Sequence, residues 1–170
     1  QFAEALTAEI GPQYPHRALR PSDHDEGYGI LSQHPLSGDA CMRPLAESRC
    51  WQYTTVSVGT QPITVVNVHA RNPAIATVQP RWAFGQLPVR YDTSLREREI
   101  RAAVEWLDQL PRPLIVAGDF NLAPHTSAHR LLTQRLIDTH AAVGVGLGHT
   151  WPSVETLDLW PVPLVARIDY

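Results

Sequence analysis

The chain has 170 residues, of which 44% are hydrophobic and 18% charged, and its formal net charge is -3. This composition is typical of one folded domain with a sizeable core, and it excludes a disordered chain. The mildly acidic balance excludes a broad basic surface for non-specific nucleic-acid binding, although it leaves room for a local site.

The N-terminal part of the chain predicts one helix and three strands. Apolar residues recur on one face of a short helix over 2–10. The apolar run 29–32 is bounded by turn-forming residues and predicts a strand. Residues 51–58 alternate with a period of two, and residues 63–68 are rich in β-branched side chains. The turn at 59–62 joins these two strands, so we expect a hairpin.

The C-terminal part predicts two helices and a buried strand. Residues 71–91 show no period, and we expect a long loop of the kind that often carries function. Ser94 with Glu97 predicts a capping box at the start of a helix that continues to Leu110. A short apolar strand over 114–117 and a second helix over 127–135 follow. Strands that alternate with helices, together with a hairpin, predict an α/β protein with mixed sheets.

An aspartate and an asparagine follow directly after the apolar strand 114–117. They belong to the motif Gly118-Asp119-Phe120-Asn121. Ligands of α/β sheets collect at the carboxyl ends of strands, where a carboxylate binds a hard cation and an amide donates to an anionic oxygen. Glycine, aspartate and asparagine also favour ordinary turns. The motif by itself therefore leaves a catalytic site and a turn as alternatives.

Two other predicted strands also end in polar residues. Asn67 and His69 end the strand 63–68, and Asp169 lies in Arg167-Ile168-Asp169-Tyr170 after an apolar pair. Each of these alone would also fit a structural residue whose hydrogen bonds are satisfied. Three strand ends that all carry potential catalytic groups predict one shared site.

The order of these motifs resembles the endonuclease/exonuclease/phosphatase superfamily. That family includes pancreatic deoxyribonuclease, apurinic endonucleases, neutral sphingomyelinases and inositol polyphosphate phosphatases. The similarity extends over 1–170 as a single, truncated domain and rests on five segments: 27–36, 66–69, 118–121, 150–152 and 167–170. The resemblance implies two packed mixed β-sheets flanked by helices, as a four-layer α/β/β/α sandwich that is incomplete here.

The resemblance implies a catalytic role for four residues. Asp119 would orient or deprotonate the attacking water, and Asn121 would hold a phosphate oxygen. His69 would donate to the phosphoryl oxygens, and Asp169 would orient a catalytic histidine. Asp119 and Asn121 would also hold Mg²⁺, for which Mn²⁺ is an expected substitute. The expected substrate-binding residues are Asn67, Arg71, Tyr91 and Arg96.

The chain departs from the family pattern in two respects. The family's principal metal-binding glutamate lies on a strand before a helix like 2–10, and its Ser-Asp-His motif follows a strand like 167–170. Neither feature is present at the matching place in these 170 residues. We therefore expect the chain to be a fragment that is inactive or nearly so. Its parent would be a monomeric, Mg²⁺-dependent hydrolase of a phosphodiester or phosphomonoester in nucleic acid, phospholipid or inositol phosphate, without a protein partner. The alternative is a catalytically dead relative that serves as a binding module.

Several smaller features leave alternatives open. Cys41 and Cys50 are spaced to close a hairpin-sized loop, but we favour two ordinary thiols. His125 and His129 have zinc-ligand spacing, which makes a zinc hydrolase a third alternative, but we favour solvated surface residues. The resemblance is greatest to bacterial proteins. It leaves the location open between the cytoplasm and a membrane-associated or extracytoplasmic position.

Overall fold

The computed structural model describes residues 2–22, 27–78, 87–151 and 166–170, with the backbone alone for residues 2, 75–78 and 87–91. The elements in chain order are α1 (Phe2–Ile10), β1 (His16–Arg20), β2 (Tyr28–Ser32), β3 (Leu36–Met42), β4 (Trp51–Val58), β5 (Gln61–His69), β6 (Ala74–Val78), β7 (Leu87–Asp92), α2 (Ser94–Leu107), β8 (Leu114–Asp119), α3 (Ser127–Thr133) and α4 (Thr139–Val143). Among the described helices, none has the length and apolar character that crossing a bilayer requires.

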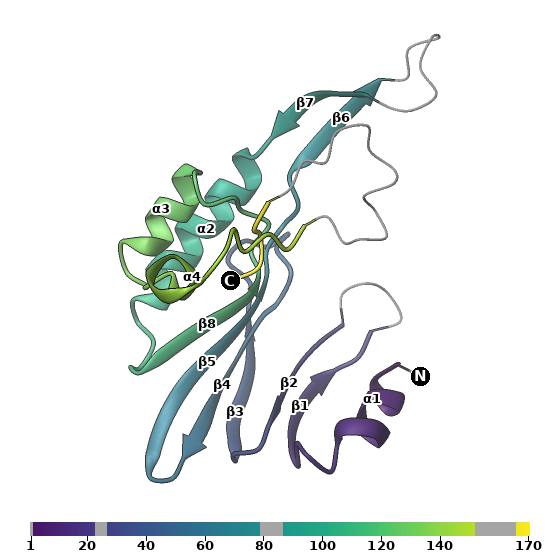
Figure 1. Ribbon diagram of the computed structural model, residues 1–170, viewed down its shortest axis with the longest axis vertical. Helices are drawn as coiled ribbons and strands as arrows, with labels where there is room; N and C mark the ends of the chain where they lie inside the picture. The colour runs from purple at the N-terminus through teal and green to yellow at the C-terminus, as the bar shows by residue number, and fades with distance from the viewer. Residues whose placement is uncertain (1, 23–26, 79–86, 152–165) are drawn as a thin grey trace.

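A mixed four-stranded sheet forms the centre of the fold, with the strand order β3-β4-β5-β8 (Figure 1). Strands β3, β4 and β5 are antiparallel, which confirms the expected hairpin, and β8 runs parallel to β5. Alternation along β5 buries Thr64, Val66 and Val68 on one face of the sheet. The intervening Asn67 and His69 therefore lie on the other face.

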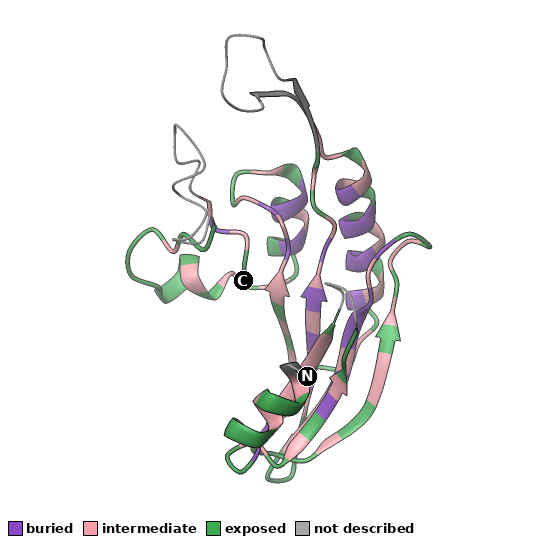
Figure 2. Ribbon diagram, turned by 90° about the vertical axis from the view of Figure 1, so that its right-hand side faces the viewer, coloured by how far each residue is buried: buried purple, intermediate pink, exposed green. Residues whose placement is uncertain are grey.

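Helices α2 and α3 cover the first face of this sheet. The buried stripe of α2 consists of Ile100, Ala103, Val104 and Leu107, as the sequence pattern predicts. Figure 2 shows these buried turns of α2 and α3 facing the strands. The main hydrophobic core therefore lies between the two helices and the sheet.

A second, antiparallel sheet of β1 and β2 lies on the opposite face of the central sheet. The buried side chain of Gln52 on β4 donates to the carbonyl oxygen of Ala18 on β1 at 2.8 Å. The side chain of Asn67 on β5 donates to the carbonyl oxygen of Gly29 on β2 at 3.3 Å. Helix α1 lies beyond β1 (Figure 1). Two packed sheets flanked by helices are thus confirmed, although among the described strands only the central sheet is mixed.

Two local expectations are wrong. The long loop over 71–91 contains an antiparallel pair, β6 and β7, which extends away from the helices (Figure 1). Pro88 and a register shift at Ala76 remove the period-two pattern that would have predicted these strands. The N-cap of α2 is Thr93 rather than Ser94, and its hydroxyl donates to Glu97 Oε1 at 2.9 Å. No side chain caps the backbone at Thr93, so the expected capping box of Ser94 with Glu97 is absent.

Candidate functional site

Three predicted strand ends meet at one edge of the central sheet. His69 at the end of β5 lies opposite Asp119 at the end of β8 in the parallel register. Asp169 pairs with Asp119 from the other side through an isolated antiparallel bridge. The backbone of Phe120 donates to the carbonyl oxygen of Ile168 at 2.9 Å. His69, Asp119 and Asp169 are thus brought side by side by the backbone itself.

Gly118 allows this close approach between strands. Its φ is 134°, in a region that side chains rarely allow, and an added Cβ would overlap the carbonyl oxygen of Val68. A side chain at this position would therefore separate β8 from β5, and with them Asp119 from His69.

Substitution of Gly118 by alanine should destabilise the protein by at least about 3 kcal/mol, because backbone strain adds to the steric overlap. Gly38 provides the matched control, since its φ is also positive at 71° but an added Cβ would meet open space. Gly38→Ala should cost only about 1–2 kcal/mol. Urea unfolding of both variants measures the difference, and equal costs would contradict the close approach at Gly118.

Asn121 fixes the carboxylate of Asp119. The backbone N–H of Asn121 donates to Asp119 Oδ1 at 2.8 Å, and the backbone of Asn121 has a φ of 52°. Its side-chain nitrogen donates to the carbonyl oxygen of Ala70 and to Oδ1 of Asn72, both at 3.0 Å, and to Asp119 Oδ2 at 3.2 Å. An asparagine suits this left-handed turn because its short side chain hydrogen-bonds locally.

The surroundings shift the pKa values of the two titratable groups in opposite directions. Burial raises the pKa of Asp119 and the charge of Asp169 adds to this, while the Asn121 N–H opposes it. Burial lowers the pKa of His69, and Arg49 lowers it further. His69 Nε2 lies 4.0 Å from Asp119 Oδ2, and both side chains are about one-third exposed, at 36% and 32%. At neutral pH the site therefore pairs a neutral imidazole with a carboxylate that is more basic than a free one.

Helix α2 holds the turns that follow β5 and β8. Arg96 is only 2% exposed, and its Nη1 donates to the carbonyl oxygen of Asn121. Glu99 is fully buried, and its Oε2 accepts from the backbone N–H of Arg71 at 2.9 Å. None of the sequence motifs includes Glu99. The signal that could have identified it is a charged residue next to the apolar stripe of α2.

Among the expected substrate-binding residues, the three whose side chains are described contact different parts of the structure. Arg96 is directed at a backbone carbonyl group, and the guanidinium of Arg71 donates to the carbonyl oxygen of Glu47. Asn67 contacts β2, as described above. Tyr91 lies in β7, and its side chain is outside the described part of the structure. Substrate contacts of these four residues stay predictions.

A buried polar cluster anchors the segment that carries Asp169. Arg167 Nη1 donates to Asp138 Oδ1 at 2.8 Å, and His129 Nε2 lies 3.2 Å from Asp138 Oδ2. The hydrogen bonds from Arg167 are the main reason that the pKa of Asp138 falls to about 2. The guanidinium carbon of Arg167 also lies 4.4 Å from the ring centre of Tyr170.

The position of His129 corrects one expectation. His129 is buried and paired with Asp138, not solvated, whereas His125 is exposed as expected. The first turn of α3 faces the core, and the sequence pattern alone does not locate its distant partner. Within the described residues no group of three or more His, Cys, Asp or Glu could hold a metal ion, so the zinc alternative gains no support there.

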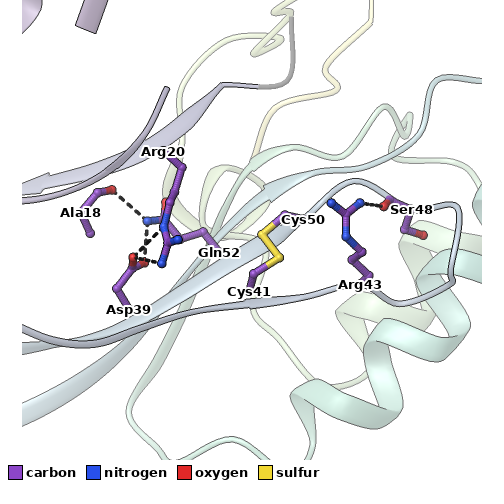
Figure 3. Close-up of a disulfide and its surroundings, with 8 residues drawn as sticks. All are labelled: Ala18, Arg20, Asp39, Cys41, Arg43, Ser48, Cys50 and Gln52. Carbon is purple, nitrogen blue, oxygen red and sulfur yellow. Dashed lines mark hydrogen bonds and ion pairs between the residues drawn. A yellow bond between two sulfur atoms is a disulfide. The ribbon is translucent and has the colours of Figure 1, made fainter. Parts of the chain in front are cut away.

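Cys41 and Cys50 form a disulfide, so the expectation of two ordinary thiols is wrong. The antiparallel pairing of β3 with β4 brings their Cα atoms to 5.5 Å, within the usual range for a disulfide. The bond closes a loop in which Arg43 Nη1 donates to the carbonyl oxygen of Ser48 at 2.5 Å (Figure 3).

The residue types at the strand ends include the oxygen ligands that a hard divalent cation prefers. Asp119 and Asp169 are paired through their backbones, and Asn121 follows two residues after Asp119. Within the described residues these side chains do not form a group of three or more His, Cys, Asp or Glu that could hold a metal ion. Mg²⁺ is usually bound through one or two carboxylates plus water and substrate phosphates, and not by a complete protein cage. Carboxylate and amide oxygens suit Mg²⁺ better than zinc, and a site of this kind would need water and substrate phosphate to complete it.

Comparisons with known proteins identify the family and agree with the fold. A sequence model described as the Endonuclease/Exonuclease/phosphatase family matches residues 2–170. No curated protein matches the chain in sequence.

Three solved structures show the same fold at low sequence identity. Sphingomyelinase C from Streptomyces griseocarneus is 19% identical, with a TM-score of 0.62 over 99% of this chain and 65% of that one. An endonuclease/exonuclease/phosphatase family protein from Leptotrichia buccalis is 16% identical, with a TM-score of 0.62 over 100% and 64%. A beta toxin mutant from Staphylococcus aureus with bound magnesium ions is 12% identical, with a TM-score of 0.60 over 99% and 65%. The chain thus spans less than two thirds of the length of these structures.

Proposed function

Because the chain belongs to the Endonuclease/Exonuclease/phosphatase family, we propose that its intact protein is a Mg²⁺-dependent hydrolase of phosphate esters. The observation that carries this proposal is the convergence of His69, Asp119 and Asn121 at the ends of β5 and β8 with Asp169, which pairs with Asp119 through an isolated bridge. Carboxylates, an amide and a neutral imidazole are the groups that hydrolysis of an anionic ester needs at one point.

Each residue has a role that follows from its position. Asp119 would orient the attacking water and accept its proton, because its raised pKa makes it a more effective base than an ordinary aspartate. His69 would donate a hydrogen bond to a phosphoryl oxygen, since its lowered pKa keeps the ring neutral at pH 7. Asp169 lies against Asp119, where its charge supports that basicity.

The amide of Asn121 would bind a phosphate oxygen by exchange. Its two side-chain hydrogens are already shared among three acceptors, of which Asp119 Oδ2 is the most distant at 3.2 Å. A phosphate oxygen that replaces this weakest contact would leave the Asp119 carboxylate free to act on water. Asp119 and Asn121 would also hold Mg²⁺, which would supply Lewis-acid neutralisation of the phosphate charge.

The substrate class is a phosphodiester or phosphomonoester of nucleic acid, phospholipid or inositol phosphate. One of the solved structures with this fold is a sphingomyelinase, so a substrate panel should include a phospholipid. The fold does not select among these classes, because related sites on one scaffold serve different substrates.

The test is hydrolysis of bis(p-nitrophenyl) phosphate and of a panel of the three substrate classes by the intact protein. We expect a Mg²⁺-stimulated rate that a chelator removes, that added Mg²⁺ restores and that Mn²⁺ partly supports. Chelator resistance would contradict metal dependence. Absence of turnover, with phosphate binding retained, would favour the alternative of a binding module.

A further inference from the structure

Arg49 is a charged residue at the candidate site that neither the sequence motifs nor the proposed mechanism uses. Its Nη1 lies 3.4 Å from the carbonyl oxygen of Ala70 and 3.3 Å from Oδ1 of Asn72. The side-chain nitrogen of Asn121 donates to the same two oxygens, at 3.0 Å each. The guanidinium of Arg49 and the amide of Asn121 are therefore neighbours around one pair of acceptors.

The loop that carries Arg49 is held in place from several sides. The disulfide joins Cys41 to Cys50, the residue next to Arg49. Arg43 spans the loop to the carbonyl oxygen of Ser48, as Figure 3 shows. Because Cys50 and Ser48 are also buried, the backbone on both sides of Arg49 is fixed.

Three arginines described near the strand ends differ in what their guanidinium groups can still bind. Arg71 directs both Nε and Nη2 at the carbonyl oxygen of Glu47, and Arg96 is buried against Asn121. Among the described residues, the contacts of Arg49 use only Nη1. These contacts are longer than the roughly 2.8 Å of a charge-assisted hydrogen bond to an anion. Arg49 can therefore turn from them to a stronger acceptor.

The charge balance of the site favours such a cation. Asp119 and Asp169 are paired at the end of β8, and Glu99 on α2 binds the turn after β5, so the described site carries several acidic side chains. Arg49 places a guanidinium on the same turn, through its contacts with Ala70 and Asn72. An anionic phosphate that approaches Asp119 needs a positive charge on this side.

We propose that Arg49 binds a non-bridging oxygen of the substrate phosphate, next to the amide of Asn121. Nη1 would exchange its long contacts with Ala70 and Asn72 for the phosphate oxygen, and the closed loop would keep the guanidinium in place. This inference rests on the proposed function, but it makes a separate claim, which is that the site binds the phosphate group before any bond is broken.

The test measures phosphate binding without turnover, by titrating the intact protein with inorganic phosphate and with a non-hydrolysable phosphodiester analogue in calorimetry. Replacing Arg49 by alanine should weaken binding by about 10- to 100-fold, as expected for one hydrogen bond to a charged group. Arg49→Gln keeps a neutral donor for Ala70 and Asn72 and should bind almost as weakly as alanine. Arg49→Lys keeps the charge and should bind with intermediate strength.

Arg101→Ala is the matched control, because it removes one positive charge from an exposed position on α2. This variant should bind phosphate like the wild type. Wild-type affinity in Arg49→Ala or Arg49→Gln would overturn the proposal, and so would an equal loss in Arg101→Ala. If alanine at 49 prevents folding, the glutamine and lysine variants decide by the same criteria.

The outcomes separate this inference from the proposed function. Hydrolysis that needs Asp119 but is indifferent to Arg49 would sustain the function and reject the inference. Phosphate binding that needs Arg49, in a protein that hydrolyses none of the panel, would sustain the inference and reject the function. In an active enzyme the alanine variant should raise KM more than it lowers kcat, because Arg49 contacts the bound phosphate from the start.

Discussion

Replacement of Asp119 by asparagine should lower kcat/KM for phosphodiester hydrolysis by about 10²- to 10⁴-fold, the range expected for loss of a positioned proton acceptor. An asparagine oxygen at this position would still accept the Asn121 N–H that now binds Asp119 Oδ1 at 2.8 Å. The turn therefore stays intact while the negative charge and the basicity are lost. Asp119→Ala removes the acceptor as well and should be at least as damaging. Steady-state kinetics of the intact protein at saturating Mg²⁺ measures both.

Asp108→Asn is the control for this prediction. Asp108 is 42% exposed and accepts from Arg135 Nε at 2.9 Å at the end of α2. Its replacement removes the same charge from the surface and should leave kcat/KM unchanged. Wild-type turnover in Asp119→Asn would exclude Asp119 as the base.

Loss of the Asp138 carboxylate should have the largest effect on stability. Asp138 and Arg167 are each only 7% exposed, so Asp138→Ala leaves a buried guanidinium without its partner. Breaking such a pair costs about 3–5 kcal/mol. Arg167 also lies two residues before Asp169, so the same variant should loosen the segment that carries Asp169. Urea unfolding at neutral pH, together with kcat/KM, measures both consequences.

The exposed Asp108–Arg135 pair again provides the comparison. Its side chains are 42% and 40% exposed, and Asp108→Ala should cost less than about 1 kcal/mol. Equal costs at the two sites would contradict the buried ion pair.

Acid titration provides a second check on Asp138. The hydrogen bonds from Arg167 lower the pKa of Asp138 from its ordinary value to about 2 in the folded state. This contribution to stability is complete above the unfolded-state pKa, and it is lost as the pH falls from about 4 towards about 2. Asp138→Ala should therefore flatten the dependence of stability on pH in that window.

Local sequence patterns were enough to predict the elements whose signals are themselves local. The alternation over 51–58 and the apolar run over 114–117 correspond closely to β4 and β8, since each strand is mainly defined by which face it buries. The meeting of His69, Asp119 and Asp169 followed from three strand ends in the expected order. The parallel register of β5 with β8 then brings two of these residues to adjacent positions.

What the sequence did not predict depends on contacts between distant residues. The partner of His129 is Asp138, which no periodicity connects to it. Glu99 on α2 and Arg49, next to Cys50, both contact the turn after β5, and these contacts form only when the sheet is assembled. Strands β6 and β7 pair with an irregular register, and this removes the alternation that usually reveals a hairpin.

The Cys41–Cys50 bond has a consequence for how the protein should be produced. Disulfides persist in oxidising compartments and are rare in a reducing cytosol. Protein made in a bacterial cytosol should therefore contain molecules whose loop is held only by noncovalent contacts such as that between Arg43 and Ser48. Preparations from an oxidising compartment should be more uniform, and a count of free thiols before each assay would distinguish them.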